Sequence, residues 1–241
     1  MNDEIAIAVV QKIMVSIFGN YKTSSLEEIL NRYAFDIKLP EQVIDSTTGE
    51  TTWAASTNPM KYITEMNMEQ KDRKEGWMQK GEIANFDDII KLWEQINYRT
   101  TERVYNSMDV AKSDTIYGCE KVYRSLDSRN SKNLIFCDGV GDSEYVLASE
   151  RSANCRFCIR IADSANCTNS YAVACSNTVS NSFFIEDCSN VHECIFCAHV
   201  SNKQYCIGNV QLEKEQYEMI KKKLIENKIS LFSLHLKFLS I

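Results

Sequence analysis

Long apolar runs and a secretion signal are what this sequence of 241 residues lacks. No apolar stretch reaches the ~18 residues that a membrane-spanning helix needs. The N-terminus, Met1-Asn2-Asp3-Glu4, is acidic, whereas a secretory signal begins with basic residues. We therefore expect no membrane span, and we expect the protein in the cytoplasm or in a virion assembled there.

A clustered basic surface is also lacking. The formal net charge is −6, and the single basic run, Lys221-Lys222-Lys223, is interpreted as the solvated face of a helix. Because binding to phosphate backbones requires a basic face, we expect no nucleic-acid partner. Nucleotide-binding glycine patterns and the signatures of a catalytic triad are lacking too. The sequence thus indicates no enzyme, and we assign no catalytic or cofactor-binding residue.

Cysteine is confined to one part of the chain. All ten cysteines lie between Cys119 and Cys206. In a reducing compartment they are expected as free thiols that fill a narrow core. Both prolines and all three tryptophans lie in the first 103 residues instead. We predict a helix-rich N-terminal region at 1–103 with a polar excursion at 58–84, a cysteine-rich β-solenoid at 104–211, and a capping helix with an apolar tail at 212–241.

A twelve-residue unit repeats through the cysteine-rich part. Its marker is a serine, with one slipped residue in the third unit, found at Ser152, Ser164, Ser176, Ser189 and Ser201. A short fixed period predicts a solenoid. Even positions counted from the serine, Phe183 among them, are mostly apolar, so we expect side chains to alternate inward and outward with a period of two. Replacing Phe183 with Asp should then unfold the stack.

The unit length also predicts the shape of one turn. Twelve residues provide one strand and a corner, so we expect two units, about 24 residues, per turn of a flattened parallel solenoid. Serine and asparagine should lie at the corners and bond the local backbone. Upstream, Ser113 and Ser125 keep the spacing, as do Ser131 and Ser143, but the register breaks twice. We extend the solenoid to about Val104 and expect its first coils to be irregular.

The N-terminal region contains its own signals. Residues 5–18 predict an apolar helix that ends at Gly19 and is buried against another surface. A second helix, capped by Ser24, should follow as far as Tyr33. Residues 35–39 alternate like a strand, and residues 47–50 form a turn.

Three further segments concern the ends of the solenoid. Residues 86–98 predict a helix capped by Asn85, with an apolar face that we expect to cover the first coil. Residues 212–227 predict an amphipathic helix that covers the other end. The segment 230–241 is apolar but too short to cross a bilayer, so it either packs back or binds a partner. The predicted fold class is therefore α+β: a mixed helical region, a parallel β-solenoid of about twelve-residue units and a C-terminal capping helix.

One cluster of residues suggests a metal. His192, Cys194, Cys197 and His199 are ligand types that zinc prefers, and Cys155 and Cys158 form a second pair. In a strand, however, Cys194 and Cys197 would point to opposite faces, as would the two histidines. We therefore interpret the cysteines as core filler and expect no cofactor, with zinc as the alternative.

The residues Asn202-Lys203-Gln204-Tyr205-Cys206-Ile207-Gly208-Asn209-Val210-Gln211 and the helix after them carry a resemblance. They resemble the terminal motif of a loosely defined group of Cys-rich strand-repeat proteins of bacterial and phage genomes. The resemblance implies stacked strands and a phage or bacterial origin, and it brings no active site.

Two functions are consistent with these patterns. The first is a non-enzymatic structural or protein-interaction scaffold, a subunit of a larger assembly such as a phage virion, with partners or further copies bound through residues 1–103. The alternative is a zinc-binding module that uses His192, Cys194, Cys197 and His199.

Overall fold

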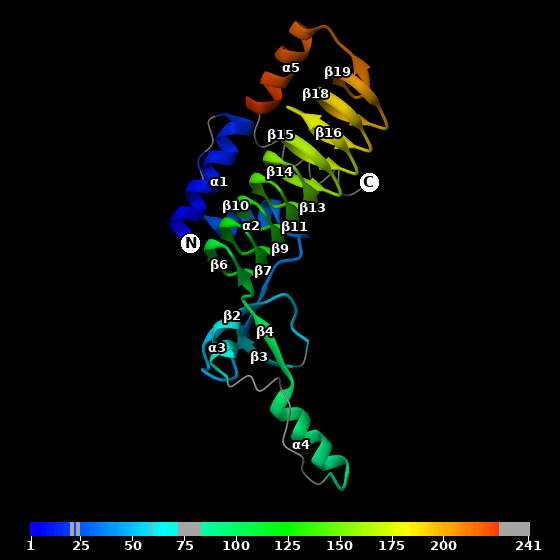
Figure 1. The fold of residues 1–241 in the computed structure, drawn as a ribbon. Helices are drawn as coiled ribbons and strands as arrows, with labels where there is room; N and C mark the ends of the chain where they lie inside the picture. The colour runs from blue at the N-terminus through cyan, green and yellow to red at the C-terminus, as the bar shows by residue number, and fades with distance from the viewer. Residues whose placement is uncertain (20–21, 23–24, 59, 72–82, 227–241) are drawn as a thin grey trace.

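The computed structural model describes residues 1–19, 22, 25–58, 60–71 and 83–226 (Figure 1). Its architecture is α+β, as the sequence predicts: a helical N-terminal region, a parallel β-solenoid and a C-terminal helix. The elements before the solenoid are α1 (Asp3–Phe18), α2 (Leu26–Tyr33), β1 (Glu41–Ile44), β2 (Thr51–Ala54), β3 (Lys61–Thr64), α3 (Glu65–Gln70), α4 (Phe86–Ile96) and β4 (Tyr98–Thr101).

The solenoid strands follow in chain order. They are β5 (Val104–Tyr105), β6 (Met108–Ala111), β7 (Asp114–Tyr117), β8 (Glu120–Tyr123), β9 (Leu126–Arg129), β10 (Lys132–Ile135), β11 (Asp138–Gly141), β12 (Glu144–Leu147), β13 (Glu150–Ala153), β14 (Arg156–Ala162), β15 (Ala165–Ala174), β16 (Asn177–Ser180), β17 (Phe183–Glu186), β18 (Ser189–Ala198) and β19 (Ser201–Ile207). The antiparallel strand β20 (Val210–Gln211) closes the last coil, and α5 (Lys214–Glu226) comes after it.

Adjacent coils are offset by twelve residues throughout the solenoid. Val104 lies beside Ile116 at the first coil, and Ile195 lies beside Ile207 at the last. Strands two apart in chain order pair in parallel through the first coils, as β6 does with β8 and β7 with β9. Each twelve-residue unit is therefore a complete coil with two short strands. The predicted turn of two units, about 24 residues, is wrong, because a single strand does not fill the unit.

The coil closes in twelve residues because the backbone bends at every third residue. Asn130, Asn133 and Phe136 have φ values of 48°, 58° and 56°, and this spacing continues along the solenoid. A left-handed residue between extended ones interrupts the two-residue alternation of a strand. Inward side chains therefore recur every third residue, as at Leu134 and Cys137, which are both fully buried. The predicted period of two is wrong.

Small side chains fill the space inside the coil. Valine, isoleucine, leucine and most of the cysteines make up this inner core. Inward serines bond the backbone, as predicted: the Ser125 hydroxyl donates to the Tyr123 carbonyl at 3.0 Å and accepts from the Cys137 N–H at 3.1 Å. Because Cys137 belongs to the next coil, each such serine ties two coils together.

The serine marker changes position without any change in coil length. Asn177 lies beside Ser189, so Cys188 takes the inward position next to Ser176. The slip seen in the sequence thus moves the serine by one position and inserts no residue. The first coils keep the same register, with Asp114 beside Leu126. The irregularity that we predicted for them is therefore wrong.

A second core lies outside the coil, between α1 and one face of the solenoid (Figure 1). Phe18 of α1 meets Tyr171 edge to face, with ring centroids 5.3 Å apart. Phe183 is 2% exposed and belongs to this outer core, 6.2 Å from the Phe18 ring. Phe183 is thus buried as expected, but it points outward beneath a helix and not into the coil.

The predicted C-terminal helix, α5, covers the side of the last coils. Tyr217 is fully buried in the outer core that α1 begins. Lys221 Nζ donates to the Asn181 carbonyl at 3.2 Å and pairs with Glu193 at 2.5 Å. Because Asn181 and Glu193 are one coil apart, α5 runs along the solenoid and extends the cover of its apolar face.

The N-terminal predictions have mixed outcomes. α1 confirms the buried helix that ends before Gly19. α2 is capped by Ser25, whose hydroxyl accepts from the Glu28 N–H, whereas the predicted cap Ser24 lies outside the described residues. Residues 35–39 contain turns and no strand, and β1 begins after Pro40. The turn at 47–50 joins β1 to β2 as predicted.

Parts of two predicted segments lie outside the described residues. The excursion at 58–84 contains β3 and α3, but residues 59 and 72–82 are not described, and neither is the apolar tail 230–241. Among the helices that the structure does describe, none has the length and apolar character to cross a membrane.

Candidate functional site

The segment from His192 to His199 does not converge on one point. Cys194 and Cys197 both point into the coil and are 0% and 1% exposed, because a spacing of three matches the inward period. The two side chains that we expected on opposite faces therefore share one, and that expectation is wrong. His192 lies outside the coil with its Nδ1 2.7 Å from the Ser180 hydroxyl. His199 is exposed, with its Nδ1 2.8 Å from an Asp187 carboxylate oxygen.

The described residues contain no group of three or more His, Cys, Asp or Glu side chains placed to hold a metal ion. The second cysteine pair, Cys155 and Cys158, is also buried inside the coil. No contact in the described parts of the chain thus favours the zinc alternative over core packing.

Nine of the ten thiols are buried, and Cys175 alone is exposed; all ten are free. Burial raises the pKa of Cys137 to about 12. Burial likewise raises the pKa of Cys119, Cys188 and Cys206. Since the thiolate is the reactive form, these four thiols are poor nucleophiles at neutral pH. Their packing supports the interpretation of cysteine as core filler.

Ser180 and His192 face each other across β16 and β18, and the Ser180 hydroxyl contacts His192 Nδ1. A histidine bonded to a serine hydroxyl is the arrangement that activates a nucleophile when a third group orients the histidine. The neighbours in the same outward column are Thr168 and Gln204, one coil to either side. Both are uncharged, so this column supplies no carboxylate to orient the imidazole.

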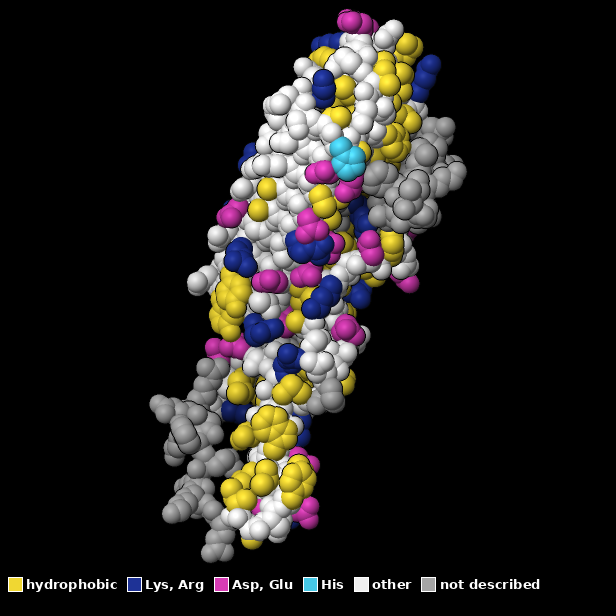
Figure 2. All heavy atoms as spheres, turned by 90° about the vertical axis from the view of Figure 1, so that its right-hand side faces the viewer, with side chains coloured by type: hydrophobic (Ala, Val, Ile, Leu, Met, Phe, Trp, Pro, Cys, Tyr) yellow, Lys and Arg dark blue, Asp and Glu magenta, His cyan; other side chains and the backbone are white. Residues whose placement is uncertain are grey.

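α4 exposes a group of large apolar side chains at the end of the molecule opposite α5 (Figure 1). No residue of α4 is buried. Its exposed apolar side chains include Phe86 at 71%, Trp93 at 52%, and, between 39% and 49%, Ile89, Ile90 and Ile96. Figure 2 shows hydrophobic side chains gathered over this end of the molecule. The cover of the first coil that we predicted for this helix is therefore wrong.

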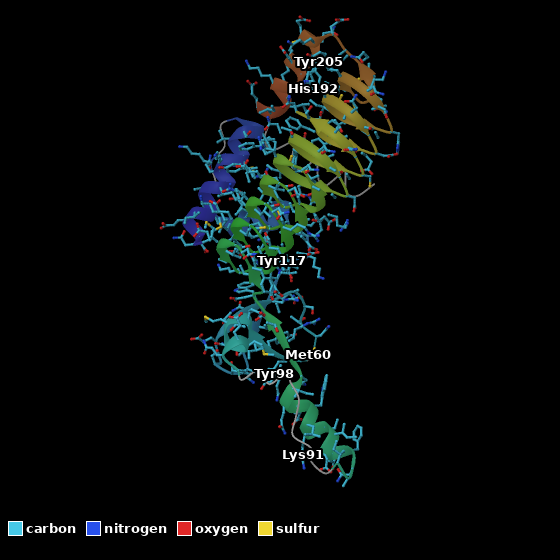
Figure 3. The ribbon with its side chains drawn as sticks, in the orientation of Figure 1. Met60, Lys91, Tyr98, Tyr117, His192 and Tyr205 are labelled. Atoms are coloured by element: carbon cyan, nitrogen blue, oxygen red, sulfur yellow. The ribbon has the colours of Figure 1, made fainter. Side chains whose placement is uncertain are left out.

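The helix itself is well defined at its start. Asn85 and Asp88 form a capping box, in which the Asn85 side chain accepts from the Asp88 N–H and the Asp88 carboxylate accepts from the Asn85 N–H. Asp87 and Glu94 are exposed, and Lys91 is the only basic side chain of the helix. Figure 3 labels Lys91 at the far end of the molecule from His192.

A small module of β1 to β4 and α3 connects α4 to the solenoid. β4 follows α4 directly and pairs in parallel with β3. Inside the module, the hydroxyls of Thr52 and Thr101 lie 2.7 Å apart, and both residues are fully buried. Asp45 is also fully buried and accepts from Thr47, from the Thr64 N–H and from Asn67. These buried hydrogen bonds stabilise the module from which α4 extends.

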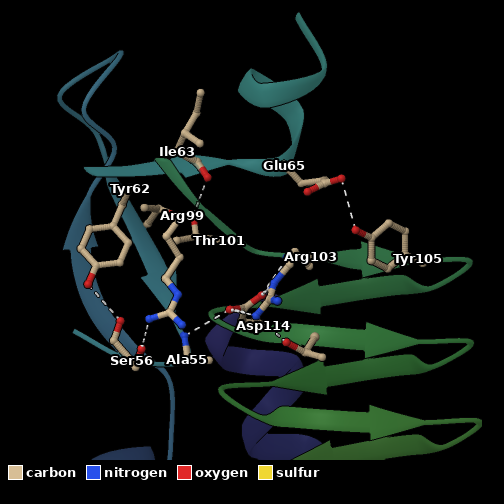
Figure 4. Close-up of polar contacts among 12 residues, drawn as sticks. Ala55, Ser56, Tyr62, Ile63, Glu65, Arg99, Thr101, Arg103, Tyr105 and Asp114 are labelled. Carbon is tan, nitrogen blue, oxygen red and sulfur yellow. Dashed lines mark hydrogen bonds and ion pairs between the residues drawn. The ribbon is translucent and has the colours of Figure 1, made fainter. Parts of the chain in front are cut away.

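Asp114 joins this module to the first coils (Figure 4). Arg103 donates to both carboxylate oxygens, from Nε and Nη2, at 2.9 Å each, and the Ala55 N–H donates to one of them at 3.1 Å. The Asp114 side chain is 1% exposed. A bidentate pair of this kind fixes orientation as well as distance. The first coil is therefore covered by the module, while α4 extends beyond it.

No sequence pattern predicts this ion pair, because Arg103 and Asp114 are ordinary charged residues eleven positions apart in a region where many charges face solvent. The apolar face of α4, by contrast, was visible as a pattern. The structure was needed to show that no other described part of the chain covers this face.

Comparison with protein-family models, with curated proteins and with solved structures found no match to this chain. The resemblance of residues 202–211 to Cys-rich strand-repeat proteins therefore stays a prediction.

Proposed function

We propose that this chain is a non-enzymatic protein-interaction scaffold, in which the solenoid and its N-terminal module hold α4 out for a partner protein. The observation that carries the proposal is the exposure of five of the six large apolar side chains of one helix, with only Leu92 half-buried. Contiguous exposed apolar surface of this kind is a mark of protein–protein contact sites.

The spacing of the side chains fits one mode of recognition. Phe86, Ile89, Ile90 and Trp93 occupy positions i, i+3, i+4 and i+7, the set that anchors an amphipathic helix in an apolar groove. The eleven residues of α4 span about 16 Å at 1.5 Å per residue. The partner site is thus expected to be an apolar groove of similar length with a pocket for an aromatic ring.

Charge favours a different protein over a second copy. α4 carries Asp87, Asp88 and Glu94 but only Lys91 as a counter-charge. Pairing two copies of α4 would bring these carboxylates together, and like charges at an interface oppose association. A groove bordered by basic residues complements the helix. We therefore commit to a partner with a basic rim, and treat self-association as an outcome of the test.

The test places a photoreactive amino acid at Trp93 in the full chain expressed in its native host. A second chain with the photoreactive residue at Lys91, on the polar side, serves as the matched control. Any protein captured through position 93 is identified, purified and titrated against the unmodified chain. The titration is repeated with Trp93→Asp, which is expected to weaken binding at least about 30-fold, since a buried aromatic anchor contributes 2 kcal/mol or more.

Three results would contradict this proposal. Crosslinking to a second copy, with an oligomer mass that falls in Trp93→Asp, would replace the partner by self-association. A lower unfolding temperature for Trp93→Asp in the isolated chain would show that another part of the same chain covers the face. Equal affinity of the Trp93→Asp variant for the captured protein would remove α4 from the interface.

The larger assembly to which the scaffold belongs is a separate proposal. A virion subunit, or another large assembly, is proposed on the resemblance of residues 202–211 alone.

A further inference from the structure

A trough of about 930 Å³ runs along the solenoid on a sheet that includes β11 and β13. The face that α1 covers is a different one, formed by strands such as β10 and β12. One column of residues lines the trough at successive coils: Arg129, Gly141, Ala153, Ala165, Asn177, Ser189 and Ser201. With coils about 4.8 Å apart, this column is roughly 29 Å long. The trough is therefore a straight, extended feature.

The shape of the trough follows from the three-residue period. Ser164, Ser176 and Cys188 turn their side chains into the coil, so only their backbone forms the floor. The neighbouring column carries Ala153 and Ala165 at the middle of the trough, where the side chain ends at Cβ. The middle is consequently the place where a ligand can come closest to the backbone.

Charged side chains of both signs form the wall. Arg151 donates to both oxygens of Asp163, with Nε–Oδ1 and Nη2–Oδ2 distances of 2.5 and 2.7 Å, and its Nη2 and Nη1 also lie 2.9 and 2.8 Å from the Glu150 carboxylate. Asp187 lies two coils further along the same column and holds His199 at 2.8 Å. Together with Arg129 and Asp142, the lining contains two arginines and three aspartates. The lining therefore has little net charge, and it is richer in acceptors than in donors, because Arg151 is already paired with Asp163 and Glu150.

These features select among classes of linear ligand. A polyanion such as nucleic acid needs a clustered basic surface, which two arginines beside three aspartates do not provide. An extended peptide binds a free sheet edge and places alternate side chains in pockets. The strands here are already paired on both sides, and the apolar lining residues are no larger than cysteine. A chain of uncharged, hydroxyl-rich units can bond the polar lining without a basic surface and without a free strand edge.

We propose that this trough binds a linear, uncharged polysaccharide along the solenoid axis. Hydroxyl groups of successive sugars accept from Arg129 and donate to the carboxylates of Asp142, Asp163 and Asp187, because a carboxylate has more acceptor positions than its partners in the protein use. The site is distinct from α4 and does not depend on the docking function. Removal of the α4 partner would leave it intact.

The test measures migration of the full chain in native gels that contain hydroxyethylcellulose, glucomannan, amylose or mixed-linkage β-glucan, followed by a glycan array. Ala165→Trp fills the middle of the trough, and Arg151→Ala removes the guanidinium group that holds the Asp163 acceptor in place. Each is expected to weaken binding about tenfold or more, because hydrogen bonds to a charged group contribute at least 1.5 kcal/mol. Lys203→Trp, at an exposed position outside the trough, is the matched control and should bind like the unmodified chain.

Circular dichroism melting shows whether each variant is folded, and a folded Ala165→Trp with lost retardation supports the proposal even if Arg151→Ala is unstable. The proposal is overturned by a folded chain that none of the four polysaccharides retards and that gives no signal on the array. Retardation by heparin alone would overturn it too. So would retardation that Ala165→Trp leaves unchanged.

Discussion

Replacing Ser125 with alanine tests how the coils are tied together. The Ser125 hydroxyl accepts from the Cys137 N–H at 3.1 Å and donates to the Tyr123 carbonyl at 3.0 Å, and both Ser125 and Cys137 are fully buried. The substitution leaves the Cys137 N–H without its acceptor. An unsatisfied buried donor costs about 1–3 kcal/mol, and the loss of one oxygen atom adds only a small cavity. We expect the free energy of unfolding to fall by about 2 kcal/mol.

The assay is urea denaturation at 25 °C followed by circular dichroism. Ser125→Cys is the informative companion, because Cys137 occupies the same position one coil further on and its thiol bonds the Ile135 carbonyl at 3.4 Å. Ser125→Cys should lower the free energy of unfolding by less than half as much as Ser125→Ala does. Ser201→Ala, at an exposed serine, should change it by less than about 0.5 kcal/mol. An alanine at position 125 that costs no more than the one at position 201 would refute the reasoning.

Two predictions concern the N-terminal module. Asp114→Ala should lower the stability of the module by about 2–4 kcal/mol, less than for a fully buried pair because Arg103 is one-third exposed, and hydrogen exchange of β2 to β4 would show it. Burial alone would raise the pKa of Asp45, but hydrogen bonds from its neighbours lower it below the ordinary 3.8. The carboxylate therefore stabilises the module above pH 3.8, and this contribution is lost as the pH falls toward the folded pKa. In Asp45→Asn, the unfolding temperature followed by tryptophan fluorescence should fall less steeply between pH 4 and lower pH than in the unmodified chain. An equally steep fall in the variant would contradict this role of Asp45.

The unit length was predictable because serine, cysteine and apolar residues recur every twelve positions, and the solenoid fold followed from that. The three-residue spacing of the inward side chains was not predictable, because a spacing of two and a spacing of three coincide at every sixth residue. Cys155 and Ile161 are inward and six apart, so both satisfy an even count. Ile159, between them, is outward but buried beneath α1 and imitates an alternating strand. A covered outer face therefore hides the true period.

The left-handed residues that set this period have a weak sequence signature. Asparagine and aspartate favour that backbone region and are common at these positions. Yet Phe136, Arg160 and Ala172 adopt it too, with φ of 56°, 59° and 55°. The stacking of coils therefore imposes the conformation on residues that would not choose it, and single residues do not reveal it.

The misplaced role of α4 has a related cause. An amphipathic pattern shows that a helix has an apolar face, but it does not show what covers that face. α1 is apolar over most of its length and is buried against the solenoid, whereas α4 has a single apolar face and that face is exposed. The zinc alternative gained no support from the structure. Cys194 and Cys197 do lie on one face, but that face is the inside of the coil, and the two histidines lie outside it.

The most direct test of the three-residue period is a count of accessible thiols in the folded protein. Brief treatment with N-ethylmaleimide at pH 8, followed by peptide mass spectrometry, reports which of the ten cysteines react. We expect one adduct, at Cys175, and reaction of the other nine only after unfolding in urea. A two-residue alternation would expose one member of each pair, Cys155 with Cys158 and Cys194 with Cys197. A rapid adduct at any of these four would contradict the arrangement of the coil.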